Sequence, residues 1–179
     1  SAFTAIVGVT VNFSPPTIYI RHVINERLLP SEMREKAVDM ARFIGASVIG
    51  MEEAGVHEHI SEPLNLLLQQ KGLYNFKVVN LVPRTGKGEQ SGYDNAKVAR
   101  VTQGLESFYK WGLVYHNPNR CCTVLEEQLL TIQGTTYVDV ADATAYITQL
   151  LEAIGRPFYD QSCHVEEALD TAKLFSLPY

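Results

Sequence analysis

The stretch that decides the fold is residues 46–53, which read ASVIGMEE. Its apolar side chains lie between Gly45 and Gly55, and a short apolar run with such flanks is typical of a buried strand in a parallel sheet. The run ends in two carboxylates, Glu52 and Glu53. Because an open α/β sheet binds its ligands beyond the carboxyl ends of its strands, these glutamates are candidates for a functional site.

A second pair of carboxylates lies in residues 137–155, YVDVADATAYITQLLEAIG. From Asp139 the apolar positions recur at helical spacing until Gly155, which predicts one helix of about four turns. Asp139 and Asp142 are one turn apart near its start, where one can cap the helix and the other can reach a strand end. Aspartates at a helix start are commonly caps, but the presence of Glu52 favours a shared acidic site.

The composition is that of one ordinary domain. The chain has 179 residues, 46% of them hydrophobic, and a mean hydropathy of −0.05. We therefore expect a single domain over residues 1–179, with its core in residues 3–154 and a last helix in residues 155–179. No apolar run is long enough to cross a membrane and no signal-peptide pattern occurs, so we expect an intracellular protein. The cysteines fit neither a disulfide framework nor a zinc motif and are interpreted as buried thiols.

Basic residues gather in one part of the sequence, although the net charge is −5. Between positions 84 and 120 they outnumber the acidic residues, and they are Arg84, Lys87, Lys97, Arg100, Lys110 and Arg120. Such a cluster is either a track for nucleic-acid phosphates or an ordinary solvated face. The sequence leaves both interpretations open.

The chain opens with a predicted hairpin. Residues 3–12 and 17–26 are rich in β-branched side chains, which favour strands. The residues between them include Pro15 and Pro16, which cannot continue a hydrogen-bonded ladder. These features predict two antiparallel strands joined by a short turn.

Helical and strand patterns alternate after the hairpin. We expect a helix with Ser31 as N-cap, then the strand over residues 46–53, a second helix with Ser61 as N-cap and a strand over residues 76–82. A long glycine-rich loop over residues 84–97 leads into a helix from about Asp94. A short edge strand over residues 113–115 and a short helix with Thr123 as N-cap follow. The strands on either side of the first crossover helix are expected to be parallel. The predicted fold is therefore α/β, with a mixed sheet, an antiparallel hairpin followed by parallel strands, flanked by helices.

The order and spacing of these elements resemble a known family, the C-terminal nuclease domain of the large terminase subunit of tailed bacteriophages and herpesviruses. That domain has the RNase H-like fold, and the resemblance covers residues 3–154. In the family a strand ends in a catalytic glutamate, matched here by Glu52. A Lys-x-x-Arg pair follows on a helix and is matched by Lys97 and Arg100.

The family's final helix begins with the motif His-Asp-Asp-x-x-Asp-Ala, and the corresponding residues 137–143 read YVDVADA. Tyr137 and Val138 replace the histidine and the first aspartate. Asp139 is thus the residue that matches the family's usual metal ligand, with Asp142 beside it.

The family's first strand carries an aspartate, whereas no acidic residue precedes Glu26 in this sequence. Two explanations are open. The first strand lies ahead of this chain, or residues 3–12 are that strand, with Thr10 at the position of the aspartate. We favour the first explanation because residues 3–12 and the strand that follows look like the family's second and third strands.

The resemblance implies a metal-dependent DNA endonuclease that cuts concatemeric double-stranded DNA when genome packaging begins and ends. Glu52, Asp139 and Asp142 would bind two Mg²⁺ or Mn²⁺ ions, one activating water and one stabilising the leaving oxygen. Without an aspartate from the first strand, we expect an incomplete site that binds metal weakly and cuts poorly. Strong cleavage would mean that Glu53 or Asp142 fills the role.

The resemblance also implies DNA contacts and partners. Arg84, Lys87, Lys97 and Arg100 are expected to contact DNA phosphates without reading sequence. The chain has no Walker phosphate loop, so the implied ATPase motor belongs to another domain. A small terminase subunit and a portal are further implied partners. The implied location is the interior of the host cell, in the cytoplasm for a phage or the nucleus for a herpesvirus.

Other functions remain open. One is another RNase H-like nuclease, such as a junction resolvase or a transposase-like enzyme, which would prefer branched or terminal-repeat DNA. Another is a catalytically degenerate module that binds DNA or docks on a motor. His57 and His59 form a His-x-His pair, but a zinc or manganese site there needs a third convergent ligand.

Overall fold

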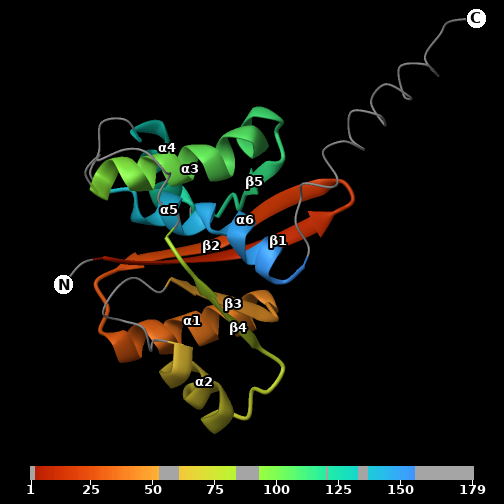
Figure 1. Cartoon of the computed structure of the whole chain (residues 1–179), viewed down its shortest axis with the longest axis vertical. Helices are drawn as coiled ribbons and strands as arrows, with labels where there is room; N and C mark the ends of the chain where they lie inside the picture. The colour runs from red at the N-terminus through yellow and green to blue at the C-terminus, as the bar shows by residue number, and fades with distance from the viewer. Residues whose placement is uncertain (1–2, 53–60, 84–92, 120, 133–136, 156–179) are drawn as a thin grey trace, which may run out of the picture.

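The computed structural model describes residues 3–52, 61–83, 93–119, 121–132 and 137–155 (Figure 1). The strands in these ranges are β1 (Thr4–Phe13), β2 (Pro16–Glu26), β3 (Val48–Glu52), β4 (Lys77–Leu81) and β5 (Val114–His116). The helices are α1 (Pro30–Ile44), α2 (Ser61–Gln70), α3 (Tyr93–Lys110), α4 (Thr123–Leu130), α5 (Asp139–Ala145) and α6 (Ile147–Ala153). This order confirms the predicted mixed α/β fold, with an antiparallel hairpin followed by parallel strands and flanking helices.

The predicted hairpin is present and forms two of the three strands of one sheet. β1 pairs with β2 in antiparallel register from Thr4 opposite Glu26 to Phe13 opposite Pro16, with an irregularity between Gly8 and Val9. β5 pairs in parallel with the other side of β2 and is an edge strand, as expected. The strand order in this sheet is β1-β2-β5.

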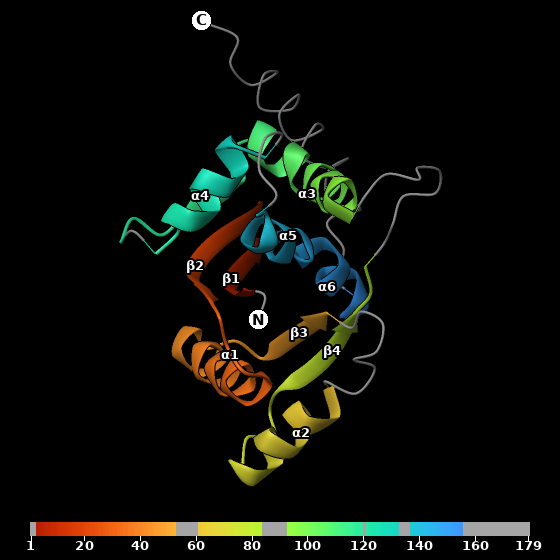
Figure 2. The ribbon, with the colours of Figure 1, turned by 90° about the vertical axis from the view of Figure 1, so that its left-hand side faces the viewer.

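The remaining two strands form a separate pair. β3 and β4 are parallel, with Val48 opposite Lys77 and Glu52 opposite Leu81. The predicted sheet is therefore present in two hydrogen-bonded parts, because the described residues include no pairing between β1 and β3. Figure 2 shows α5 beside β1 and β2, with α6 above and α2 below the pair of strands β3 and β4.

Among the described residues the hydrophobic core forms three clusters, two of which follow the division of the sheet, while the third packs β4 against Tyr146. One cluster packs β2 against α3, α4 and α5, and its fully buried members include Ile18, Leu105 and Val140. A second cluster packs α1 and α2 against β3 and includes Val38 and Leu64. Burying one such side chain contributes about 1.5–3 kcal/mol, so each half of the molecule has its own source of stability.

Helix starts differ from the sequence predictions by one or two residues. α1 begins at Pro30 with Leu29 as N-cap, and the Leu29 N–H donates to the Glu32 carboxylate at 2.7 Å. Ser31 is therefore inside the first turn and is not the N-cap. The reason is that proline suits the first helical position, where no N–H is needed. Thr123 is likewise the first residue of α4, after the N-cap Cys122.

The helix expected from Asp139 to Gly155 is two short helices, α5 and α6, which meet at Tyr146. The Thr144 hydroxyl donates to the Val140 carbonyl at 2.7 Å. A hydroxyl bonded back to its own helix commonly bends that helix. The bend places Tyr146 at the junction, where its ring is buried.

The remaining points concern the cysteines, the predicted last helix and membrane-spanning helices. Cys122 is buried as expected, whereas Cys121 is partly exposed. The predicted last helix, in residues 155–179, lies outside the described residues apart from Gly155. No helix in the described ranges is both long and apolar enough to cross a membrane.

Candidate active site at the carboxyl end of β3

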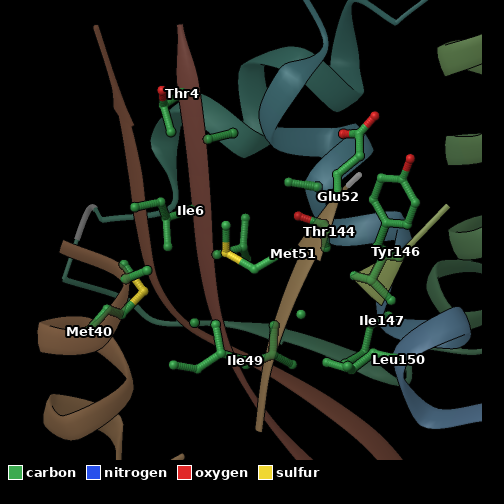
Figure 3. Close-up of a pocket in the computed structure, with 18 of the residues that line it drawn as sticks. Thr4, Ile6, Met40, Ile49, Met51, Glu52, Thr144, Tyr146, Ile147 and Leu150 are labelled. Carbon is green, nitrogen blue, oxygen red and sulfur yellow. The ribbon is translucent and has the colours of Figure 1, made fainter. Parts of the chain in front are cut away.

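Glu52 is the last residue of β3, the position that the sequence predicted for it. The parallel pairing with β4 fixes this strand end, because Glu52 lies opposite Leu81 at the end of the ladder. Its side chain lies beside that of Tyr146, at one end of a cavity between β1 and β3 (Figure 3). A rigid strand thus holds a carboxylate at the rim of a cavity.

The two aspartates of α5 do not cap their helix. The N-cap is Val138, which makes no side-chain capping bond. Instead the Gln128 side chain of α4 accepts hydrogen bonds from the N–H groups of Val140 at 2.9 Å and Ala141 at 3.0 Å. Because Gln128 satisfies these amides at the helix start, Asp139 and Asp142 are available for other partners.

Both aspartates pair with cations of α3. Lys97 Nζ donates to Asp139 Oδ1 at 2.5 Å. Arg100 makes a bidentate pair with Asp142, from Nε to Oδ1 at 2.9 Å and from Nη2 to Oδ2 at 2.7 Å. The side chains of Arg100 and Asp142 are only 12% and 4% exposed, so this ion pair is shielded from water.

The sequence spacing explains how two ion pairs form side by side. Lys97 and Arg100 are three residues apart on α3, as Asp139 and Asp142 are on α5, so each pair shares one helix face. Gly104 lets the two helices approach closely, because a Cβ atom there would lie 3.1 Å from the Ala145 carbonyl oxygen. Lys97 therefore lies opposite Asp139 and Arg100 opposite Asp142, and the two ion pairs form side by side.

Charges in the site influence one another. Burial raises the pKa of Glu52, and the negative charge of Asp142 raises it further, although Arg100 and Lys97 act in the opposite direction. Burial disfavours the charged form of Arg100, but its hydrogen bond to Asp142 and the charge of that carboxylate outweigh this effect, so the pKa of Arg100 is raised. Glu52, Asp142, Arg100 and Lys97 therefore form one electrostatic group.

Tyr146 is a site residue that the sequence analysis did not single out. The Arg100 guanidinium lies over its ring, 5.8 Å from the centroid. Its hydroxyl lies near enough to Glu52 to affect the pKa of that carboxylate, yet it is buried without a well-formed hydrogen bond. The available signal was its spacing of four residues from Asp142, which favours the same helix face.

The donor chemistry of this site suits a divalent cation, but the number of donors does not. Carboxylate oxygens are the ligands that Mg²⁺ and Mn²⁺ prefer. Asp142 is fully engaged by Arg100, which leaves Glu52 and Asp139, and the described residues contain no group of three or more acidic, histidine or cysteine side chains able to hold a metal ion. The described part of the chain thus supplies an incomplete metal site.

The other predicted site residues fall into two sets. Arg84, Lys87, Glu53, His57 and His59 lie outside the described residues. Thr10 lies six positions further along β1 than Thr4, a separation of roughly 20 Å. Since Thr4 is at the Glu52 end of the cavity, Thr10 is remote from the carboxylates (Figure 3).

The fold and the position of the site define the class of structure, a mixed α/β domain with a carboxylate at the carboxyl end of a parallel strand and two aspartates on a neighbouring helix. Comparison with protein-family models gave no match, and comparison with curated proteins gave none either. Among solved structures, the fowlpox virus Holliday junction resolvase is similar, with a TM-score of 0.53 and 14% sequence identity over 86% of this chain and 92% of that chain. The fowlpox virus resolvase in complex with Holliday junction DNA is similar too, with a TM-score of 0.52 and 16% identity over the same shares.

We predict that Arg100→Met lowers the free energy of unfolding by about 3–5 kcal/mol, because it leaves the buried Asp142 carboxylate unpaired. The double variant Arg100→Met/Asp142→Leu should regain most of this loss, since it removes both charges. Chemical denaturation of the three proteins measures the effect. Lys110→Met, at an exposed position of the same helix, is the control and should change stability by less than about 0.5 kcal/mol. An equally small loss for Arg100→Met would contradict the described ion pair.

The raised pKa of Glu52 predicts a pH-dependent effect of Glu52→Gln. A carboxyl group whose pKa is higher in the folded state favours folding at low pH, and this contribution is lost as the pH rises through the folded-state pKa. Glu52→Gln should therefore raise the melting temperature at pH 7 to 8, and the gain should shrink towards pH 4. Thermal melts across this range check the prediction, with the exposed Glu62→Gln as control. A gain that is independent of pH would refute it.

Proposed function

We propose that this chain is a nuclease domain that hydrolyses phosphodiester bonds of DNA and prefers branched DNA such as a four-way junction. The observation that carries the proposal is the convergence of Glu52 from β3 with Asp139 and Asp142 from α5, on an RNase H-like fold. Two cations, Lys97 and Arg100, lie in the same group. Carboxylates beside cations suit a reaction at a phosphate, where a proton is removed and negative charge develops.

Each side chain has a role that follows from its surroundings. The raised pKa of Glu52 brings this carboxylate closer to neutral pH, which suits exchange of a proton with an attacking water. Lys97 and Arg100 hold the two aspartates in place and reduce the repulsion between these carboxylates and a DNA phosphate. The Tyr146 hydroxyl is a buried donor beside Glu52 that can bind such a water.

A divalent cation, when bound in such a site, activates water and stabilises the leaving oxygen. Glu52 and Asp139 are the residues of this chain that would hold it, with further ligands from outside the described residues. We therefore expect dependence on Mg²⁺ or Mn²⁺ and slow cleavage by this chain alone.

Branched DNA is the proposed substrate because of the solved structures that this chain resembles. Both are fowlpox virus resolvases, and one was solved with Holliday junction DNA. The similarity extends over most of both chains. Phosphate contacts by Arg84 and Lys87 remain predictions that accompany this proposal.

A second candidate is a terminase nuclease that cuts plain double-stranded DNA. The observation in its favour is that Lys97 and Arg100, which match the Lys-x-x-Arg pair of that family, bind the two aspartates that match its acidic motif. On this alternative the ATPase motor, the small terminase subunit and the portal are the expected partners. The location would be the host-cell compartment in which viral DNA is packaged.

Cleavage of labelled DNA tests the proposal. We predict slow cutting of a four-way junction with Mn²⁺ or Mg²⁺, little cutting of a linear duplex of the same sequence, and none with EDTA. Glu52→Ala or Asp139→Ala should each lower the rate by on the order of 100-fold, because each removes a carboxylate of the site. Glu62→Ala, on the exposed side of α2, should cut like the unchanged chain.

Three outcomes decide between the candidates. Equal cutting of junction and duplex would favour the terminase alternative. Cutting that is unaffected by both substitutions would refute the assigned site. Binding that falls steeply with salt, shows no metal dependence and leads to no cutting would favour a degenerate DNA-binding module.

A further inference from the structure

One face of the three-stranded sheet is exposed beyond the end of α1. Alternate residues of β1, from Ala5 to Phe13, pack into the core cluster that β2 forms with α3, α4 and α5. The other residues of β1 face α1, because a Cβ atom at Gly8 would lie 2.9 Å from Met40 Sδ. Thr10 follows Gly8 on this second face and is exposed, as is Asn12. α1 therefore covers this face as far as Gly8 and leaves the rest open.

Two tyrosines lie on the open part of this face. Tyr19 lies between Ile18 and Ile20, which are both buried in the core, so its ring is on the opposite side of β2. Tyr115 of β5 is its parallel partner. The two rings are stacked, with centroids 5.4 Å apart, and the residues are 37% and 55% exposed. Because each ring supports the other, binding a planar ligand to them costs little side-chain entropy.

The row of aromatic rings continues towards α1. His22 lies opposite Gly8 and is therefore on the same face of the sheet. Its ring meets the exposed ring of Phe43 edge to face, with centroids 6.1 Å apart. We call the row formed by Tyr115, Tyr19, His22 and Phe43 the aromatic face. It crosses β5, β2 and α1 and offers several flat surfaces to one elongated ligand.

The polar side chains around the tyrosines indicate the chemistry of the partner. Arg21 is the extra residue of β2 at the irregularity opposite Gly8 and Val9, and it is exposed. Its backbone is held in place, because its carbonyl accepts a hydrogen bond from Asn117 Nδ2 at 2.9 Å. A guanidinium group suits a phosphate or the plane of a base.

These surroundings favour a nucleotide strand over an apolar partner. Thr10, Asn12 and Arg21 are exposed and polar, and none of the three is acidic. An apolar partner would bury their polar groups without hydrogen bonds, which is unfavourable. A single strand of nucleic acid instead supplies bases that stack on aromatic rings and phosphates that pair with arginine.

We propose that the aromatic face binds single-stranded nucleic acid, with bases stacked on Tyr19 and Tyr115 and a phosphate held by Arg21. Every base has a flat π surface, so this binding tolerates different sequences. The aromatic face is separate from the acidic site, because Tyr19 lies opposite Thr10, at the far end of β1 from Glu52. Binding there requires neither metal nor carboxylates and does not rest on the proposed nuclease function.

Fluorescence anisotropy with a labelled oligonucleotide of about fifteen thymidines, in EDTA, tests the proposal. Tyr19→Ala and Tyr115→Ala should each weaken binding by at least about fivefold, because each removes a stacking surface. Tyr19→Phe and Tyr115→Phe keep the ring and should bind like the unchanged chain. Tyr74→Ala, at an exposed tyrosine between α2 and β4, is the matched control and should also leave binding unchanged. Equal loss in the Tyr74 variant would overturn the proposal.

An abasic oligonucleotide of the same length separates stacking from charge. It keeps the phosphates and lacks the bases, so it should bind far more weakly than the thymidine strand. Arg21→Ala should weaken binding of both strands and reduce its salt dependence. Equal binding of the abasic strand, or of a blunt duplex, would show attraction to phosphates alone and would refute base stacking.

NMR of the unchanged chain tests the proposal without any substitution, in case a variant does not fold. The ring protons of Tyr19 and Tyr115 should shift upfield when the thymidine strand is added, while those of Tyr74 stay in place. No shift at saturating oligonucleotide would overturn the proposal. Sedimentation covers another partner: if Tyr19→Ala alters self-association and leaves oligonucleotide binding intact, the aromatic face joins two copies of the chain and the proposal is refuted.

Binding and cleavage fail independently. Glu52→Ala should bind the thymidine strand like the unchanged chain, because the carboxylate lies outside the aromatic face. Stacking on Tyr19 and Tyr115 in a chain that cuts no DNA would leave this proposal standing and refute the nuclease proposal. Cleavage of the four-way junction by a chain that does not bind the thymidine strand would do the reverse.

Discussion

A buried, bidentate ion pair between Arg100 and Asp142 fixes the arrangement on which the site depends. Both charged groups are almost completely shielded from water, so a buried charge would be left without its partner if α3 and α5 shifted apart. The ion pair therefore fixes these two helices relative to each other. One helical turn away, Lys97 and Asp139 form the second pair between the same helices. The positions of Asp139 and Asp142 are thus set by the packing of these two helices.

Capping of α5 by a different element makes this arrangement possible. An aspartate at a helix start usually satisfies the first amides of its own helix. Here Gln128 performs that task from α4, where it is 8% exposed. The two aspartates of α5 therefore turn towards α3 and Glu52, and the acidic group is a product of tertiary structure.

The cavity between the two parts of the sheet is next to the acidic site. The cavity between β1 and β3 is apolar along its length and charged at the end where Glu52 and Asp139 lie.

Local sequence patterns were sufficient for the elements and for the positions of the carboxylates. The apolar run before Glu52 predicted β3, and the spacing of Asp139 and Asp142 predicted neighbouring helix faces near a helix start. Patterns of this kind report burial along one element, so they could not show that Lys97 and Arg100, 42 residues earlier in the chain, would bind those aspartates. Nor could they show which strand edges meet, or that a back-bonded hydroxyl at Thr144 would bend the helix at Tyr146.

The most direct test of the acidic site is the effect of Mn²⁺ on the NMR spectrum of the chain, because paramagnetic broadening reports even weak binding. At substoichiometric Mn²⁺, broadening should be selective for residues around Glu52 and Asp139 and should disappear in a Glu52→Gln/Asp139→Asn variant. Broadening that is uniform over the acidic surface, or that persists in this variant, would show that Glu52 and Asp139 do not form a common cation site.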